Sequence, residues 1–542
     1  MQPHINKKPN YIFITGGVLS GLGKGICTAS IGKILQSYGF SVTVCKIDPY
    51  LNFDAGTMRP TEHGEVWVTK DGGEIDQDLG HYERFLNIDI PKSHNITTGQ
   101  IFYQVIQNER QGKYLGKTVQ PIPHITDEIK RRIRSLEKAD FVLVEIGGTI
   151  GDYENILFVE AIRQMKSEGE NTIFIHVTYV PVPSHLGEAK TKPTQHSVQK
   201  LREIGIIPDF IVCRSEKPLD DVRKNKISVF CDIKPDYIIS DHNIENIYEA
   251  PLIFEQQNFG EKIIKKLNLR PRSKNMKKWK NYIDKIKKIN KSIKIGIVGK
   301  YFDIGTSTLT DSYISVIEAV KHACWNNNLK PDIKWIDSKE FEKHPEKVSI
   351  LKNMDAVIVP GGFGSSGIEG KIKAIKYVRE NKIPYLGLCL GMQLAVIEFA
   401  RNVCGLKQAT STEFDKKTKN PVVDIIPDQI NIIKNSNYGA TMRLGAYPAI
   451  LKPGTLVRKL YGKEKIFERH RHRYEINPEY IEILEKNGLV FSGRSPNKIL
   501  MEFMELPNHP YFVATQAHPE FTSRFMYPNP LFDGLIKAAI RK

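Results

Sequence analysis

The sequence lacks long hydrophobic runs and contains little cysteine. Within its 542 residues no uninterrupted apolar stretch reaches the length that a transmembrane helix needs, about 18 residues or more. The seven cysteines include no CxxC pair, so the sequence fits neither a disulfide framework nor a zinc site. We therefore expect a cytoplasmic protein in a reducing compartment, without a membrane partner.

Acidic residues are almost missing from one stretch of the chain. Residues 262–294 contain 14 lysines and arginines but a single acid, Asp284, so most of the net charge of +17 lies there. The apolar residues Trp279, Ile283 and Ile286 have roughly helical spacing. This spacing predicts a linker with a short amphipathic helix at residues 272–292. An RNA-binding arm is the alternative, but aromatic residues are too sparse to favour it, and we expect no nucleic-acid partner.

The chain is too long for one hydrophobic core, because single cores stop growing at about 250 to 300 residues. Short β-branched runs precede glycine-rich or polar turns on both sides of the linker, for example YIFIT, FVLVEI and TIFIHVTYV before it and IKIGIVGK, AVIVPGG and IPYLGLCLG after it. Strands that alternate with helices predict an α/β protein with two doubly wound, mainly parallel-sheet domains. Ligands are expected at the carboxyl ends of the strands.

A glycine-rich loop follows the first predicted strand in YIFIT-GGVLSGLGKG-ICTAS. Such a loop directs backbone N–H groups and a helix amino terminus at an anion, and Lys24 adds a positive charge. The Walker A pattern fails, since Val18 and Gly25 stand where it needs a glycine and a hydroxyl residue, and the Rossmann pattern fails at Ile26. We predict a phosphate site, with a tight strand–helix turn as the alternative.

Magnesium at this loop would need ligands from elsewhere, because no hydroxyl follows Lys24. Glu145 ends the apolar strand FVLVE, and Asp78 lies in the acidic segment EIDQDLGHYERF. Either carboxylate alone would more often be a surface or helix-capping acid, whereas the two beside a phosphate loop suit Mg²⁺. The segment KTKPTQHS at residues 190–197 has the lysines and threonines of a second polyphosphate site, although a solvated turn would look similar.

A cysteine flanked by glycines marks the second half of the chain. In IPYLGLCLGMQ, Gly387 and Gly391 surround Cys389 between a predicted strand and a helix. This pattern is typical of a nucleophile elbow, where a sharp turn exposes the side chain and the helix amino terminus favours a thiolate. A buried, inert thiol is the alternative reading, which we assign instead to other cysteines: Cys27, Cys45, Cys213 and Cys231.

A base and an oxyanion loop accompany this cysteine. In QAHPEF, His518 and Glu520 are two residues apart in a predicted extended segment, so they should share a face, with the carboxylate orienting the imidazole. PGGFG at residues 360–364 follows a strand and can offer N–H groups to an oxyanion, together with that of Leu390. These residues predict acyl transfer through a thioester.

The motifs PGGFG, GLCLGMQ and HPEF, in this order, resemble those of class I glutamine amidotransferases, which hydrolyse glutamine to glutamate and ammonia. GGVLSGLGKG, KIDPYLNFDAGTM, HGEVWV, DLGHYERF, TVQPIPHIT, VEIGGTIGDYE and KTKPTQHS are similar to those of the CTP synthase family. With GATMRLGA and ERHRHRYE, the resemblance runs from about Asn10 to about Ile540. It implies a P-loop-like amidoligase (synthetase) domain at 1–271 that binds ATP, UTP and CTP, a basic linker at 272–292, and an amidotransferase domain at 293–542.

The resemblance also implies a reaction. ATP would phosphorylate O4 of UTP, with Lys46 needed for that step, and ammonia released at Cys389 would displace the phosphate to give CTP, a step of pyrimidine biosynthesis. ATP and glutamine would be co-substrates and Mg²⁺ the cofactor. GTP would be an allosteric activator and CTP a feedback inhibitor, and the enzyme would be a homotetramer.

Matched motif by motif, the resemblance implies contacts for each ligand. The ATP contacts are Gly21, Leu22, Gly23, Lys24, Gly25, Ile26 and Asp78, and the metal ligands are Asp78 and Glu145. The UTP and CTP contacts are Ser20, Asp152, Tyr153, Glu154, Lys190, Thr191, Lys192, Pro193, Thr194, Gln195 and Lys226. The glutamine contacts are Gly362, Leu390, Gly391, Met392, Gln393, Glu413 and Arg473, and Arg443 is the candidate for the GTP site.

The sequence departs from the family pattern at positions that bear on regulation. Ser365 and Ser366 stand where many members carry an arginine after PGGFG, and Tyr153 stands where isoleucine is expected between two acids. We therefore expect weaker GTP activation and altered CTP inhibition. Two rival functions remain: a glutamine-dependent ligase that amidates a cofactor carboxylate, and a partitioning-type ATPase with a relic amidotransferase domain.

Overall fold

A computed structural model describes residues 8–59, 64–136, 138–185, 187–300, 303–304, 307–308, 310–426, 429, 439 and 441–541. The chain divides into two compact units. The first contains residues 1–54 and 78–284, and the second contains residues 55–77 and 285–542. A short segment of the amino-terminal half thus belongs to the same unit as the carboxyl-terminal half.

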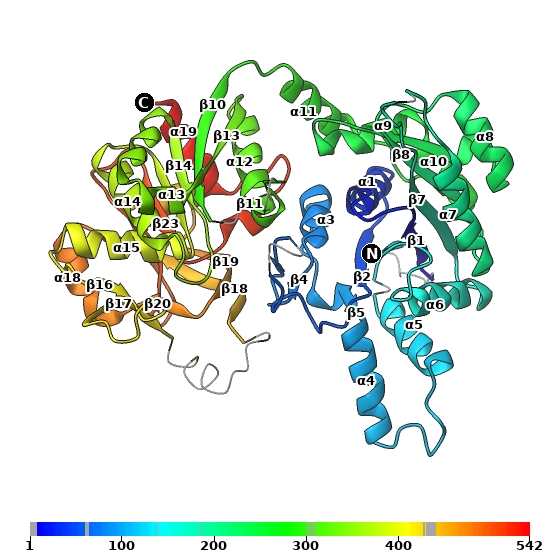
Figure 1. Cartoon of the computed structure of the whole chain (residues 1–542), viewed down its shortest axis with the longest axis horizontal. Coiled ribbons are helices and arrows are strands. Elements are labelled where there is room, and N and C mark those ends of the chain that lie inside the picture. The colour runs from blue at the N-terminus through cyan, green and yellow to red at the C-terminus, as the bar shows by residue number, and fades with distance from the viewer. Residues whose placement is uncertain are drawn as a thin grey trace. The chain divides into compact units, whose positions relative to one another are not determined.

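The first unit is built on a seven-stranded parallel sheet with the strand order β5-β2-β6-β1-β7-β8-β9. Figure 1 labels β1, β2, β5, β7 and β8 of this sheet. Its strands are the β-branched runs of the sequence, buried on both faces as parallel strands are. They are β1 (Asn10–Gly16), β2 (Val42–Asp48), β5 (Asn95–Thr97), β6 (Phe141–Ile146), β7 (Thr172–Tyr179), β8 (Phe210–Ser215) and β9 (Ile238–His242).

Helices connect these strands and cover the sheet. On one face, α4, α5 and α6 pack over alternate residues of the central strands, including Phe13, Ile47 and Val144, to form an apolar core. The helices of the unit are α1 (Lys24–Ser37), α3 (Asp78–Leu86), α4 (Thr98–Arg110), α5 (Thr126–Arg134), α6 (Ile156–Ser167), α7 (Lys192–Glu203), α8 (Asp221–Cys231), α9 (Ala250–Gln256) and α10 (Phe259–Lys266).

The second unit has a nine-stranded sheet with the order β13-β10-β14-β15-β23-β22-β21-β18-β19 (Figure 1). Its first five strands are parallel and the others antiparallel. The strands are β10 (Ser292–Gly299), β13 (Lys330–Asp337), β14 (Ala356–Val359), β15 (Tyr385–Leu388), β18 (Arg443–Leu451), β19 (Lys465–His472), β21 (Val490–Arg494), β22 (Met501–Glu505) and β23 (Phe512–Thr515).

Two apolar cores lie on this sheet. One includes residues of α14 and α15, and the other includes residues of α12, α17 and α19. The helices are α12 (Ile314–Asn326), α13 (Ser338–Lys343), α14 (Ile368–Glu380), α15 (Leu390–Asn402), α17 (Leu456–Tyr461), α18 (Ile481–Lys486) and α19 (Pro530–Ile540). Smaller strands complete the unit: β3 (Trp67–Val68), β4 (Glu74–Ile75), β11 (Asp303–Ile304), β12 (Ser307–Thr308), β16 (Ala409–Ser411), β17 (Asn420–Ile425) and β20 (Tyr474–Ile476).

The predicted α/β fold class is confirmed, because each unit contains a large sheet in which helices join parallel strands. The predicted amphipathic helix is α11 (Lys277–Lys287), which buries Trp279, Ile283 and Ile286. The indole of Trp279 donates to the carbonyl oxygen of Tyr248 at 2.8 Å, which ties the helix to the first unit. Among the described residues, no helix has the length and apolar character to cross a membrane.

Candidate active sites

The glycine-rich loop joins β1 to α1 at the carboxyl edge of the first sheet. Gly21 and Gly23 have positive φ angles of 74° and 81°, which glycine adopts without strain. Lys24 begins α1, is only 9% exposed, and donates from Nζ to the carbonyl oxygen of Gly148 at 2.9 Å. Burial lowers the pKa of Lys24, against the opposing effect of the Glu145 carboxylate.

Gly25 explains why this loop departs from the Walker A pattern. A Cβ atom at this position would lie 2.4 Å from Oδ1 of Asp78, closer than atoms can approach. The carboxylate of Asp78 therefore fills the space that a hydroxyl side chain would take in a Walker A loop. The predicted partnership between the loop and a distant carboxylate is present in the structure.

Lys46 joins the two predicted metal ligands. Its Nζ forms a short ion pair with Asp78, lies 2.9 Å from Oε1 of Glu145 and lies 4.0 Å from Asp48. Burial alone would raise the pKa of Asp78, but Lys46 beside it lowers that pKa below its ordinary value. Burial raises the pKa of Asp48 to about 6, against the opposing effect of Lys46.

Glu145 has further partners that the sequence did not indicate. Its Oε2 accepts a short hydrogen bond from the hydroxyl of Tyr82 and one of 3.2 Å from Thr28. Tyr82 comes from α3, Thr28 from α1 and Glu145 from β6, so three elements fix this carboxylate. Tyr82 lies within the DLGHYERF motif, and this motif is the sequence feature that could have indicated its contact with Glu145.

The donor set fits magnesium. Mg²⁺ in nucleotide sites is held by one or two carboxylates, with phosphate oxygens and water completing the shell. Asp78 and Glu145 face a common point, since one ammonium contacts both. Within the described ranges no group of three or more His, Cys, Asp or Glu side chains is arranged to hold a metal ion.

The KTKPTQ motif lies at the amino terminus of α7. Thr191, Thr194 and Gln195 are buried, and the amide of Gln195 donates to the hydroxyl of Thr191 at 3.1 Å. Lys190 pairs with Glu188 at 2.9 Å, while the ammonium of Lys192 lies 5.5 Å from the ring centre of Phe230. Pro193 is the second residue of the helix, a position that proline favours.

The other predicted UTP and CTP contacts are exposed. Ser20 lies in the glycine-rich loop, and Asp152, Tyr153 and Glu154 follow β6 in the loop that carries Gly148. Tyr153 is 95% exposed. Lys226 is exposed on α8, and in the described part of the chain no hydrogen bond or ion pair links it to the other predicted contacts.

Cys389 stands at a sharp strand–helix turn, which is the backbone geometry of a nucleophile elbow. It stands between β15 and α15 with φ 51° and ψ −104°, a strained conformation for a residue with a side chain. A Cβ atom on Gly391 would lie 2.1 Å from the carbonyl oxygen of Val359, so only glycine fits there. The thiol lies 3.9 Å from the carbonyl oxygen of Arg471 and 3.7 Å from the amide nitrogen of Gln516.

His518 and Glu520 interact, but not for the predicted reason. Nδ1 of His518 is 2.7 Å from Oε1 of Glu520, while Nε2 is buried without a partner among the described residues. The segment is not extended, because Pro519 begins a 3-10 helix at Pro519–Thr522, so the extended-segment prediction was wrong. Burial alone would lower the pKa of His518, but Glu520 and Cys389 raise it to about 10.

The PGGFG loop lies over the cysteine. A Cβ atom on Gly361 would meet Cε1 of His518 at 2.9 Å and Cβ of Cys389 at 3.5 Å. This close approach places the backbone of the loop against the side chains of both Cys389 and His518. The loop is therefore positioned to offer N–H groups to an oxyanion, with the amino terminus of α15 on the other side.

Charged side chains hold this loop by its main chain. Lys300 donates to the carbonyl oxygens of Phe363 and Gly364, the latter at 2.9 Å, and Lys371 donates to that of Pro360 at 3.4 Å. Glu413 accepts from Gly364 N at 3.0 Å. Lys371 is fully buried. Burial and the charge of Lys300 lower the pKa of Lys371 to about 7, whereas Cys389 acts to raise it. Sequence reasoning missed both lysines, because each reads as an ordinary polar position.

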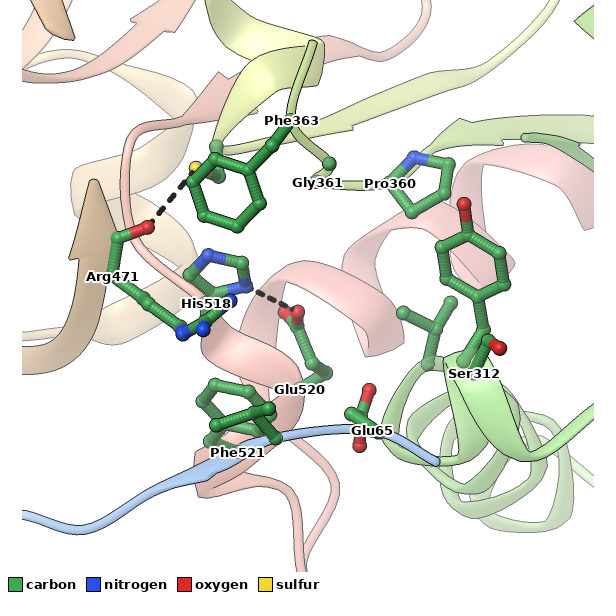
Figure 2. Close-up of a pocket in the computed structure, with 14 residues that line it drawn as sticks. Glu65, Ser312, Pro360, Gly361, Phe363, Arg471, His518, Glu520 and Phe521 are labelled. Atoms are coloured by element: carbon green, nitrogen blue, oxygen red, sulfur yellow. Dashed lines mark hydrogen bonds and ion pairs between the residues drawn. The ribbon is translucent and has the colours of Figure 1, made fainter. Parts of the chain in front are cut away.

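The cavity at Cys389 includes residues of the early chain. Glu65 and Val66 line it with Cys389, His518 and Glu520, and Figure 2 shows Glu65 on its segment beside Ser312. A carboxylate oxygen of Glu65 accepts from Ser315 N at 3.1 Å, close to the start of α12. HGEVWV was noted only as a family motif, and nothing in its composition indicated this contact.

Arg471 connects the same early segment to the oxyanion loop. Its Nε donates to Glu74 at 2.7 Å, and both side chains are largely buried. The guanidinium also lies 5.1 Å from the ring centre of Phe363 (Figure 2). The position of one arginine thus depends on a carboxylate almost 400 residues earlier in the chain.

The predicted glutamine contacts are only partly gathered at the thiol. Gly362 lines the cavity with Cys389, but neither Glu413 nor Arg473 is among its described lining residues. Arg473 instead donates to Gln429 at 2.6 Å and Thr441 at 2.9 Å. Leu390, Gly391, Met392 and Gln393 form the buried first turn of α15.

Arg443, the candidate for the GTP site, is paired with an internal acid. Its Nη2 lies 2.6 Å from Glu502, and its guanidinium lies 4.4 Å from the ring centre of Tyr447. Burial would lower the pKa of Arg443, but Glu502 raises it. Burial and the charge of Arg443 hold the pKa of His470 and His472 well below the ordinary value, so both rings stay neutral.

Comparison with known proteins finds a family match for each half of the chain. The family model for the CTP synthase N-terminus matches residues 10–269, and that for class-I glutamine amidotransferases matches residues 308–538. The CTP synthase of Methanocaldococcus jannaschii is 54% identical over 538 residues, covering 98% of each chain, and that of Pyrococcus abyssi is 54% identical over 533 residues, covering 98% of this chain and 97% of its own. The solved glutaminase domain of Trypanosoma brucei CTPS, with bound acivicin, is 38% identical and covers 46% of this chain and 95% of its own, with a TM-score of 0.43.

The two sites define a ligase that obtains its nitrogen by hydrolysing glutamine. The chain belongs to the CTP synthase family, since its similarity to the curated relatives extends over 98% of its length. It is a carbon–nitrogen ligase that converts UTP to CTP with ATP and glutamine as co-substrates.

Proposed function

We propose that the synthetase unit works by way of a 4-phosphorylated UTP. The γ-phosphoryl group of ATP is transferred to O4 of the uracil ring, and ammonia then adds at C4 and displaces phosphate, giving CTP, ADP and inorganic phosphate. The observation that carries this proposal is the buried cluster of Lys24, Lys46, Asp78 and Glu145 beside the glycine-rich loop. Its two lysines suit phosphate oxygens, and its two carboxylates suit Mg²⁺.

In this reaction Lys24 and residues 21–26 bind the ATP phosphates, and Asp78 and Glu145 hold Mg²⁺. The metal, when bound, neutralises charge that develops on the transferred phosphoryl group. Lys46 pairs with both carboxylates and is therefore able to keep them oriented and to stabilise negative charge on the phosphoryl oxygens. Residues 190–195, with Ser20 and Lys226, bind UTP.

The amidotransferase unit supplies ammonia. The thiol of Cys389 attacks the amide carbon of glutamine, and the oxyanion accepts hydrogen bonds from the PGGFG loop and from Leu390 N. His518 takes the thiol proton at Nε2 and gives it to the departing nitrogen, releasing ammonia and leaving a thioester. Glu520 holds the ring through Nδ1, and water then releases glutamate.

Regulation and assembly complete the proposal. CTP inhibits by binding at residues 152–154, and GTP activates glutamine hydrolysis at a site that includes Arg443. The enzyme forms a homotetramer and works in the cytoplasm, which suits seven free cysteines.

Ultraviolet absorbance tests the proposed function, because conversion of UTP to CTP changes the spectrum. We expect CTP from UTP, ATP and Mg²⁺ with glutamine or with ammonium, and ¹⁸O from O4-labelled UTP in the released phosphate. Unlabelled phosphate would contradict the phosphorylated intermediate. Hydrolysis of ATP without a spectral change would contradict the function itself.

A further inference from the structure

His176 lies between the two nucleotide motifs of the synthetase unit. It belongs to β7, next to β1, and its side chain is completely buried. Its Nδ1 lies 2.9 Å from the hydroxyl of Thr15, just before the glycine-rich loop, and its Nε2 lies 2.7 Å from the hydroxyl of Ser197 on α7. One ring thus contacts both the strand that carries the loop and the helix that carries KTKPTQ.

The loop and the helix also touch directly. A Cβ atom on Gly17 would lie 1.5 Å from the hydroxyl oxygen of Ser197 and 2.8 Å from Nε2 of His176. Gly17 N donates to the carbonyl oxygen of Val177 at 3.0 Å, which holds the start of the loop against β7. The loop can therefore rest on α7 only because residue 17 has no side chain.

The histidine remains neutral at this position. Burial, and next the positive charge of Lys24, lower the pKa of His176 to about 3. A neutral imidazole has one N–H donor and one acceptor nitrogen, and two hydroxyl groups satisfy both. Displacing either Thr15, at the end of β1 where the loop begins, or α7 would leave a buried ring nitrogen without its partner, which is unfavourable.

We propose that His176 is a positioning residue that couples the glycine-rich loop to the KTKPTQ helix, so that each nucleotide prearranges the site of the other. This inference rests on the proposed assignment of the loop to ATP and of residues 190–195 to UTP. A coupling of this kind is reciprocal: UTP tightens ATP binding by the same factor by which ATP tightens UTP binding.

Three substitutions isolate the two contacts of the ring. Ser197→Ala removes one hydroxyl with little change in volume. His176→Asn keeps an amide nitrogen near the Nδ1 position and loses the contact with Ser197, whereas His176→Gln keeps one near Nε2 and loses the contact with Thr15. Gln199→Ala, an exposed position on the same helix, is the matched control.

The measurement is the dissociation constant of a non-hydrolysable ATP analogue, with and without saturating UTP. The ratio of the two constants is expected to exceed one in the wild type and in Gln199→Ala. It should fall by about threefold to tenfold in Ser197→Ala and His176→Asn, as expected for one lost hydrogen bond. His176→Gln should lower it as well.

A purely structural role would give a different result. It would lower the melting temperature of the variants and leave the ratio unchanged, and that outcome would overturn the proposal, as would a wild-type ratio of one. Far-ultraviolet circular dichroism reports whether each variant is folded. Wild-type protein that makes no CTP would instead contradict the proposed function.

Discussion

The two units present their reactive groups on the same kind of scaffold but prepare them differently. In each, a parallel strand leads through glycines into a helix. In the first unit the ammonium of Lys46 forms ion pairs with the carboxylates of both Asp78 and Glu145. In the second the strain at Cys389 and the contact between His518 and Glu520 are already in place. The lysine and carboxylates of the first unit would have to exchange partners before contacting a ligand, whereas the Cys389, His518 and Glu520 group is already arranged.

The largest difference between the two units is expected when the nucleophile is removed. Cys389→Ala should lower glutamine-dependent CTP synthesis by more than about 10³-fold, because the thioester can no longer form. Synthesis from ammonium should stay near the wild-type rate. The spectral assay with each nitrogen donor checks this, and Cys404→Ala, a partly exposed cysteine, is the control. An equal loss with both donors would contradict the division of labour.

The opposite test removes the charge at the phosphate loop. Lys24→Ala should lower synthesis from either donor by about 10²- to 10³-fold, since a group that stabilises the transferred phosphoryl is lost. Labelling of Cys389 by a glutamine analogue should be unchanged. Lys200→Ala, an exposed lysine on α7 that pairs with Glu203, is the control. Wild-type synthesis from ammonium in Lys24→Ala would show that this loop is not the ATP site.

A smaller effect is expected from the carboxylate behind the base. Glu520→Gln should lower glutamine hydrolysis by about 10²-fold, because the imidazole loses its orientation and part of its basicity. Ammonium-dependent synthesis provides the internal control. A change of less than twofold in glutamine hydrolysis would mean that Glu520 does not support the base.

The same variant makes a prediction about stability. The pKa of His518 is raised to about 10 from an ordinary value of 6.5. Its contribution to stability is therefore complete below about pH 6.5 and is lost as pH rises through about 10. The difference in melting temperature between wild type and Glu520→Gln should be larger at pH 7 than above pH 10. A difference that grows with pH would contradict this assignment.

The smallest predicted effect concerns the missing arginine. Ser365 and Ser366 are exposed, and Lys300 and Lys371 already hold the carbonyl oxygens of the loop before them. We expect GTP to activate glutamine hydrolysis, and Ser366→Arg to raise the activation factor by about twofold, as a charge-assisted hydrogen bond replaces a neutral one. Glutaminase activity with and without GTP, at saturating ATP and UTP, checks this, with Ser365→Ala as control. An unchanged factor would show that the lysines compensate fully.

Sequence reasoning was sufficient where local pattern determines geometry. The elbow at Cys389 follows from its flanking glycines, and the carboxylate beside Gly25 was inferred because no hydroxyl follows Lys24. It failed where a local rule competed with another, as when Pro519 began a 3-10 helix in a segment predicted to be extended. It also missed Lys371, because a lysine on an amphipathic helix is usually solvated, and this one is buried under the loop.

The contacts of Glu65 and Glu74 could not be predicted from local sequence patterns, because their partners lie hundreds of residues away in the chain. Residues 55–77 belong to the amidotransferase unit, so the chain passes between the units three times. A cut in the basic linker would sever only one of these passages. A separately expressed fragment of residues 293–542 would lack one wall of its cavity and would leave the buried Arg471 without its carboxylate. Dividing the gene in two would therefore require the early segment to be supplied with the later half.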